Sequence, residues 1–323
     1  MWIGRTLAAL LVLLSSVPTS FADDAYPSKP VHIIFPSTAG GSGDARTRLV
    51  AERLSARLGQ RFVVENKAGA GTTIGTKAVA AARPDGYVLL ATYTPALPVG
   101  PLVYREAGYD PVTSFTPIAM FAAGSPFLVV HPSVAARTVK ELVDLAKAKP
   151  GSVSFGHAGL GSSNHLPAEL FRQNAGIDLL FVPYKSEADA LVDVLGGQVM
   201  AGFFYTAIAV PQIKAGKVRA LAVARAERNP VVPDVPTLTE AGYPVCEFIA
   251  TTYLLGPAGV PEKVVALLNR EIAAIMQEPD VRAQYSATGA DPVYGTVEEV
   301  RARLAREISL NLSLARALNL RPE

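Results

Sequence analysis

Short apolar runs alternate along this chain with segments in which apolar residues recur every three or four positions. The run 31–35 (VHIIF), bounded by Pro residues, predicts a strand, whereas residues 44–58, with Val50 and Leu54 on one side, predict a helix. The predicted strands are 31–35, 61–65, 87–92, 127–131, 153–155, 179–183, 199–205, 218–224 and 248–255. The predicted helices are 44–58, 73–82, 138–149, 164–175, 186–195, a short one between the strands 199–205 and 218–224, 261–276 and one that begins at 296.

This alternation predicts the domain organisation. Continuous apolar strands between helices indicate an α/β fold in which helices cover both faces of a sheet. Gly- and Pro-containing interruptions at 122–126 and 239–244 separate a middle block from the rest. We expect residues 23–125 and 246–323 to form lobe 1, and the inserted residues 126–245 to form lobe 2. Two crossings between lobes form a hinge, and the cleft between them is a favoured place for a ligand.

The first 22 residues have the pattern of a signal peptide. Arg5 precedes an uncharged run rich in Leu and Ala, and residues 20–22 (SFA) fit a small-x-small cleavage site. The run is shorter than the roughly 18 apolar residues that span a bilayer, so an uncleaved anchor is the less favoured alternative. We predict cleavage after Ala22 and a periplasmic mature protein that begins at Asp23.

Charge and cysteine content narrow the function further. The chain has 30 Lys and Arg against 28 Asp and Glu, which argues against binding nucleic acid or membrane surfaces through bulk charge. With Cys246 as its one cysteine, the chain forms no intramolecular disulfide. We interpret Cys246 as a small core or edge residue rather than a nucleophile.

Three glycine-rich loops each follow a predicted strand and precede a predicted helix. They are 37–44 (STAGGSGD), 66–75 (NKAGAGTTIG) and 156–165 (GHAGLGSSNH). A helix N-terminus offers unpaired N–H groups and a positive dipole end, so two such loops facing each other predict a site for a small anion. An ordinary strand-to-helix turn is the alternative for the first loop. A phosphate-binding or dinucleotide-binding loop is disfavoured, because neither signature is complete.

The sequence gives less support for a catalytic site or a metal site than for an anion-binding site. An exported hydrolase would use Ser163 with His165, but the Gly-x-Ser-x-Gly turn is missing, and we favour His165 as a capping or packing residue. The four histidines lack metal-ligand spacing. We therefore expect no enzyme, no metal and no cofactor. Arg46 is expected to point away from the site, so that no arginine clamps the ligand.

The chain resembles the Bug family of periplasmic solute receptors, the binding proteins of tripartite tricarboxylate transport systems. The likeness runs from about residue 30 to 308 and rests on motifs in a fixed order. They are 35–44 (FPSTAGGSGD), 64–71 (VENKAGAG), 84–87 (PDGY), 159–166 (GLGSSNHL), 182–185 (VPYK), 195–199 (LGGQV), 218–223 (VRALAV), 233–237 (PDVPT) with 240–242 (EAG), and 257–261 (PAGVP).

The resemblance implies a fold and a set of ligand contacts. It implies a two-lobed periplasmic binding protein of the Venus flytrap, type II-like class, each lobe a sheet flanked by helices, with a two-strand hinge. The lobes would close on a small carboxylate, held largely by backbone N–H groups and bound waters. The implied ligand-binding residues, to which we add Thr92 and Tyr205, are Thr38, Ala39, Gly40, Asp44, Gly71, Thr72, Gly161, Ser162, Ser163, Asn164 and His165.

Several positions depart from the family pattern. Ser37-Thr38 replaces a second proline, Ser186 replaces a glycine, and residues 202–206 (GFFYT) replace a Phe-Asp-Asn-like stretch. Thr252 or Tyr253 stands where the family usually has a tryptophan. The ligand is therefore expected to be a dicarboxylate, an amino-dicarboxylate or an aromatic acid, without a closer assignment. The expected partners are the membrane subunits of a tripartite tricarboxylate-type transporter or, as the alternative, a sensor kinase, with the receptor a monomer.

Overall fold

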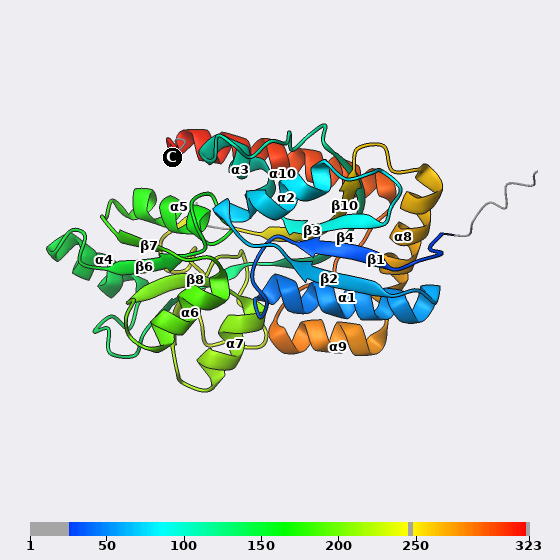
Figure 1. Cartoon of the computed structure of the whole chain (residues 1–323). Coiled ribbons are helices and arrows are strands. Elements are labelled where there is room, and N and C mark those ends of the chain that lie inside the picture. The colour runs from blue at the N-terminus through cyan, green and yellow to red at the C-terminus, as the bar shows by residue number, and fades with distance from the viewer. Residues whose placement is uncertain (1–25, 245–247, 321–323) are drawn as a thin grey trace, which may run out of the picture.

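The computed structural model describes residues 26–244 and 248–320 and contains two five-stranded mixed sheets (Figure 1). The first has the order β2-β1-β3-β10-β4 and the second β7-β6-β8-β5-β9. The predicted signal peptide, the lobe boundary at 245/246 and Cys246 lie outside the described residues. We call the first sheet with its helices lobe 1 and the second sheet with its helices lobe 2.

Lobe 1 is built from two separate stretches of chain. The strands β1 (Val31–Phe35), β2 (Phe62–Asn66) and β3 (Val88–Tyr93) are parallel, whereas β10 (Ala250–Pro257) is antiparallel to both β3 and β4 (Phe115–Gly124). One face is covered by α1 (Ser42–Leu58), α8 (Glu262–Ile275) and α9 (Pro279–Thr288). The other is covered by α2 (Thr73–Ala80), α3 (Ala96–Val103) and α10 (Val297–Ala317). A short 3₁₀ turn, η1 (Ala70–Thr72), precedes α2.

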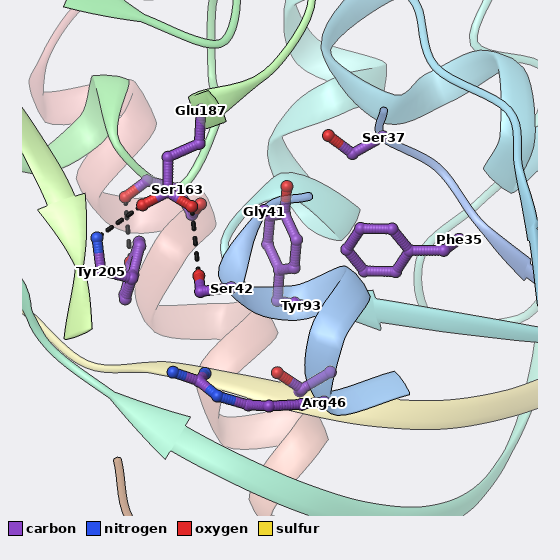
Figure 2. Close-up of a pocket in the computed structure, with 11 residues that line it drawn as sticks. Phe35, Ser37, Gly41, Ser42, Arg46, Tyr93, Ser163, Glu187 and Tyr205 are labelled. Atoms are coloured by element: carbon purple, nitrogen blue, oxygen red, sulfur yellow. Dashed lines mark hydrogen bonds between the residues drawn. The ribbon is translucent and has the colours of Figure 1, made fainter. Parts of the chain in front are cut away.

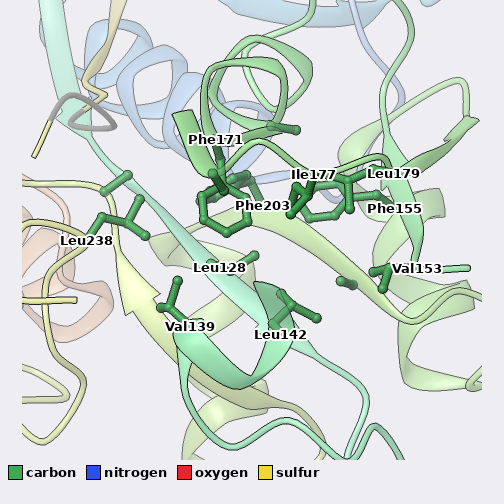
Figure 3. Close-up of a cluster of buried hydrophobic side chains, with 14 of the residues drawn as sticks. Leu128, Val139, Leu142, Val153, Phe155, Phe171, Ile177, Leu179, Phe203 and Leu238 are labelled. Atoms are coloured by element: carbon green, nitrogen blue, oxygen red, sulfur yellow. The ribbon is translucent and has the colours of Figure 1, made fainter. Parts of the chain in front are cut away.

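Lobe 2 repeats the plan with one continuous stretch. Its strands are β5 (Pro126–Val130), β6 (Ser154–His157), β7 (Leu180–Pro183), β8 (Ala201–Tyr205) and β9 (Arg219–Val223). Its helices are α4 (Val139–Ala148), α5 (His165–Ala175), α6 (Glu187–Leu195) and α7 (Thr206–Lys214). Apolar side chains of α4 and α5 pack on one face of the sheet around Phe155, Phe171 and Phe203 (Figure 3). Burial of these side chains, about 1.5–3 kcal/mol for each large one, stabilises the lobe.

The lobes are joined where the apolar runs are interrupted. β4 of the first sheet ends at Gly124 and β5 of the second begins at Pro126, so Ser125 alone separates them. The lobes also touch through helices. Val99 of α3, together with Ala315 and Leu318 at the end of the chain, belongs to the same buried cluster as the α4 and α5 side chains of lobe 2. This packing was not foreseen from the sequence.

Most predicted elements are present with small shifts at their ends. α1 begins at Ser42, two residues before the predicted start, and Thr296 and Glu299 form the reciprocal cap expected at the start of α10. The elements missing from the prediction are α3, β4, α9 and η1. No helix within residues 26–244 or 248–320 is both long and apolar enough to cross a membrane.

Candidate functional site

A small cavity lies between the lobes, at the carboxyl ends of β1 and β3 and the N-terminus of α1 (Figure 2). Its free volume is about 30 Å³, room for roughly two water molecules. Ligands of open α/β sheets bind at this kind of location, outside the carboxyl ends of the strands. The residues that line it are Phe35, Ser37, Gly41, Ser42, Gly43, Arg46, Tyr93, Ser163, Glu187, Tyr205 and Thr252.

The N-terminus of α1 forms one wall of the cavity. Gly41 is the N-cap of α1 and makes no side-chain capping bond. Gly43 lets the helix start pack tightly, since a Cβ there would lie 2.6 Å from the Phe35 ring. Ser42 and Arg46, four residues apart, share the helix face that meets the cavity. This wall therefore presents N–H groups, a hydroxyl and a guanidinium to the cleft.

From the sequence we expected Arg46 to point away from the site, and this prediction is wrong. Its side chain lines the cavity and the residue is only 8 % exposed. Nη2 donates to Thr206 Oγ1 of lobe 2 at 3.0 Å, while the buried Nε has no hydrogen-bond partner. Desolvation lowers the pKa of Arg46, with Tyr285 and Glu187 opposing that change. A buried guanidinium N–H without an acceptor is costly, and an anionic ligand is one way to satisfy it.

Glu187, the first residue of α6, approaches the same helix start from lobe 2. Its Oε2 accepts a hydrogen bond from Ser42 Oγ at 3.1 Å, and its Oε1 accepts one from the Tyr205 N–H. Desolvation raises the pKa of Glu187, although its hydrogen-bond donors and Arg46 oppose the rise. A carboxylate of the protein therefore lies at the helix start where the sequence suggested a ligand carboxylate.

Tyrosine and serine hydroxyls complete the cavity. Tyr93 lines the cavity together with Ser37 of its own lobe and Ser163 of the other lobe. The Tyr205 hydroxyl donates to the Ser163 carbonyl at 3.0 Å. Burial raises the pKa of both tyrosines, so both remain neutral hydrogen-bonding groups. The site thus has polar groups from both lobes at short range.

Ser37, Gly41, Ser42 and Gly43 of the first predicted loop line the cavity, but the residues of that loop predicted to bind the ligand lie beside it. Thr38 is partly buried, and Ala39 and Gly40 are exposed. Asp44, two positions from Ser42, is on the opposite side of α1, because two residues turn a helix by about 200°. Its carboxylate accepts from the Gly40 N–H, Asn66 and Arg48. Burial alone would raise the pKa of Asp44, but these hydrogen bonds lower it overall.

The predicted loop 156–165 is largely bonded to itself. Asn164 Oδ1 accepts from the Ala158 N–H and from Ser162 Oγ, and His165 Nδ1 accepts from the Gly161 N–H. The rings of His165 and His157 are in tilted contact, with ring centroids 4.5 Å apart. Of this loop only Ser163 lines the cavity, and Tyr205 is the other predicted residue that does.

The remaining predicted residues are distributed around the lobe junction. Gly71 lines a larger groove of about 480 Å³ together with Gly159 and Lys185 of lobe 2. A Cβ on Gly71 would lie 2.8 Å from the Leu160 carbonyl oxygen, so the lobes meet closely there. Thr72 and Thr92 are buried with unpartnered hydroxyls and line neither space.

The sequence reasoning missed Tyr93 and Glu187 as site residues. The predicted residue was Thr92, but successive strand side chains point to opposite faces, and Tyr93 is the one on the cavity side. Glu187 follows Ser186, whose side chain caps α6 directly after β7. An acidic residue at a predicted helix start that follows a predicted strand could therefore have indicated Glu187 as a site residue.

The arrangement does not support the hydrolase alternative. Nδ1 of His165 accepts a backbone N–H, and its Nε2 lies 3.7 Å from Glu169. Burial keeps the pKa of His165 well below its ordinary value. In the described part of the chain no hydrogen bond joins Ser163 to His165, and no group of three metal-ligating side chains is found.

Comparisons with known proteins match nearly the whole chain to one family. The family model described as the tripartite tricarboxylate transporter family receptor matches residues 46–320. Protein BugT of Bordetella pertussis is 36 % identical over 309 residues, which cover 94 % of each chain.

Two solved structures are similar throughout. Rpa4515 of R. palustris, determined with adipate, has a TM-score of 0.88 and 33 % identity, covering 92 % of this chain and 100 % of the other. MatC of Rhodopseudomonas palustris, with bound malate, has a TM-score of 0.86 and 30 % identity, covering 90 % and 99 %. The expected fold class, two sheets flanked by helices as in periplasmic binding proteins, is confirmed.

Proposed function

Because the chain belongs to the tripartite tricarboxylate transporter receptor family, a family of periplasmic solute-binding proteins, we propose that it captures a small carboxylate between its lobes. Capture is binding without catalysis. The ligand is then delivered to the membrane subunits of a tripartite tricarboxylate-type transporter. We further propose that the signal peptide ends at Ala22, that the mature receptor is a periplasmic monomer, and that residues 126–245 are its inserted lobe.

The observation that carries this proposal is Arg46, a guanidinium in the cavity wall with a buried, unpartnered Nε. It stands on α1, whose N-terminus attracts anions through its N–H groups and dipole. The hydroxyls of Tyr93 and Ser163 can donate to a ligand oxygen from the two lobes, whereas the Tyr205 hydroxyl donates to the Ser163 carbonyl. The similar structures bound to adipate and malate support a carboxylate as the ligand class.

Capture requires the lobes to move. A cavity of about 30 Å³ is too small for an acid of six or more heavy atoms. The link at Ser125 between β4 and β5 is the simplest place for a hinge, since a few backbone angles there reorient the two sheets. The ligand therefore enters an opened cleft, and closure brings Ser163 and Tyr205 to the ligand.

A thermal-shift screen tests the proposal on the mature chain. Dicarboxylates, amino-dicarboxylates and aromatic acids are compared with neutral sugars, and an acid present far above its Kd should raise Tm by several degrees. Stabilisation by a sugar and by none of the acids would sink the proposal. Mass spectrometry of co-purified small molecules provides an independent identification of the ligand.

A receptor that docks on a sensor kinase remains the second candidate, because a closed two-lobed receptor can serve either partner. Co-purification with detergent-solubilised permease subunits, increased by ligand, supports delivery to the transporter. Ligand-dependent association with a sensor domain alone supports the second candidate.

A further inference from the structure

Glu187 occupies the donors that a ligand carboxylate would be expected to use. The Ser42 hydroxyl donates to it from lobe 1, and the Tyr205 N–H donates to it from lobe 2. The carboxylate is thereby held at the cavity wall by one donor from each lobe (Figure 2). The strongest anion-binding position of α1 is consequently filled from within the chain.

Arg46 and Glu187 line the same cavity but do not neutralise each other directly. In the described part of the chain no ion pair joins them. Arg46 is held by Thr206, and Glu187 by Ser42 and Tyr205. Each charge is therefore fixed separately, with the guanidinium Nε still lacking an acceptor. A cavity with fixed and separate opposite charges complements a ligand that carries both signs.

A second ligand carboxylate fits this arrangement poorly. It would lie against Glu187 in a poorly solvated space, where like charges repel more strongly than in water. An ammonium at the same place would be attracted, and it would compensate the desolvation of the Glu187 carboxylate. The direction of the pKa shift of Glu187 agrees with this, since desolvation disfavours its charge more than its hydrogen-bond donors and Arg46 favour it.

We infer that Glu187 is a specificity-determining residue, and that the site selects small acids that also carry an ammonium group. In this arrangement Arg46 and the cavity hydroxyls hold the ligand carboxylate, and Glu187 faces the ammonium. The inference rests on the proposed function, because it names the ligand class of the same cleft. It narrows that class from carboxylates in general to amino-group-bearing acids.

The test compares acids that share a skeleton and differ by the ammonium group. Binding of succinate against aspartate, and of propionate against β-alanine, is measured by titration calorimetry at one pH and salt concentration. The best acid of the screen is compared with its own amine-bearing or amine-free counterpart in the same way. The chains are the wild type, Glu187→Gln, which keeps the shape but removes the charge, and Glu52→Gln, a matched change on the exposed side of α1.

The wild type is expected to bind the ammonium-bearing member of a pair at least about tenfold more tightly, the usual size of one well-placed charge interaction. Glu187→Gln should bring this ratio close to one, by weakening the ammonium-bearing acid and strengthening its partner, whereas Glu52→Gln should not change it. Tight wild-type binding of amine-free acids, or a ratio that Glu187→Gln leaves unchanged, overturns the inference and leaves the proposed function standing. Binding of no acid by any of the chains overturns both.

Discussion

The loop before α1 and the loop before α5 both follow a strand, both contain several glycines, and both end at a helix start. Their polar groups nevertheless have different partners. In the loop before α5, Asn164 and His165 accept hydrogen bonds from N–H groups of the same loop. In the loop before α1, Ser42 donates across the cleft to Glu187, 145 positions away in sequence.

The difference comes from which acceptors are close in sequence. An Asn or His at a helix start can accept from the loop's own N–H groups, which closes the loop on itself. Ser42 and Arg46 have no such local acceptor on their side of α1, because Asp44 is on the opposite side. The polar groups at the start of α1 therefore reach across the cleft in which we propose that the ligand binds, whereas the loop before α5 is bonded to itself and offers Ser163 to the cavity.

The largest expected effect separates two arginines of α1. Arg46→Met should weaken binding of the captured acid about a hundredfold, because it removes the buried guanidinium from the cavity. Arg48→Met should change affinity less than about threefold, since Arg48 is half-exposed and contacts Asp44 and Asn66. Titration calorimetry on both variants, with circular dichroism to confirm folding, checks this. Equal losses would show that α1 does not face the ligand as we describe.

The second effect is a pH dependence located at His157, the last residue of β6 before the loop that leads to α5. Burial lowers the pKa of His157 to about 4, from about 6.5 in an unfolded chain. Between pH 4 and 6.5 His157 therefore binds more protons in the unfolded state than in the folded state. Its contribution to the free energy of unfolding is complete above pH 6.5 and is lost as the pH falls towards 4. The loss amounts to roughly 3 kcal/mol.

His157→Phe removes this contribution while retaining an aromatic ring beside Phe181. The Tm difference between the variant and the wild type should shift in favour of the variant as the pH falls from 7.5 to 4.5. Glu187 has the opposite effect on stability, because its pKa is raised in the fold. It is present in both proteins, so its contribution cancels in the Tm difference. A difference that stays constant with pH would show that His157 titrates normally in the fold.

The third effect compares two glycines with positive φ. Gly40 (φ +91°) has open space where a Cβ would be placed, whereas a Cβ on Gly161 (φ +70°) would lie 2.6 Å from Val99 Cγ1 of the other lobe. Gly40→Ala should cost about 1 kcal/mol of backbone strain without changing affinity much. Gly161→Ala should cost about 2 kcal/mol and also lower affinity several-fold, because it pushes the lobes apart. Small-angle scattering should then report a larger radius of gyration for Gly161→Ala alone.

The smallest effect distinguishes neighbouring serines. Ser163→Ala removes a cavity hydroxyl and should weaken ligand binding about fivefold, equivalent to about 1 kcal/mol. Ser162→Ala removes a 2.8 Å hydrogen bond to Asn164 Oδ1 and should lower stability by about the same amount without changing affinity. Calorimetric titration and thermal denaturation of both variants separate the two roles. If Ser162→Ala instead lowers affinity and Ser163→Ala lowers only stability, the ligand contacts Ser162 and not Ser163.

The sequence alone determined the order of most elements, because apolar periodicity and capping residues act within a few positions. Residues 31–35 were predicted as a strand with both ends correct. α3 was missed because 96–103 contains two prolines and no polar face, and β4 because it contains Pro117 and ends in the Gly- and Pro-containing interruption at 122–126. The glycine-rich loops were also found, since glycine marks turns and helix starts directly.

Only the tertiary structure decided which side chains reach the cleft. Arg46 and Asp44 are both polar residues at the start of one helix, and the packing of α1 on its sheet directs the first into the cavity and the second away from it. Glu187 meets Ser42 because the two sheets bring their strand ends together. Local sequence fixes the helix and the loop, whereas the partner of a hydrogen-bond donor depends on contacts between segments far apart in the chain.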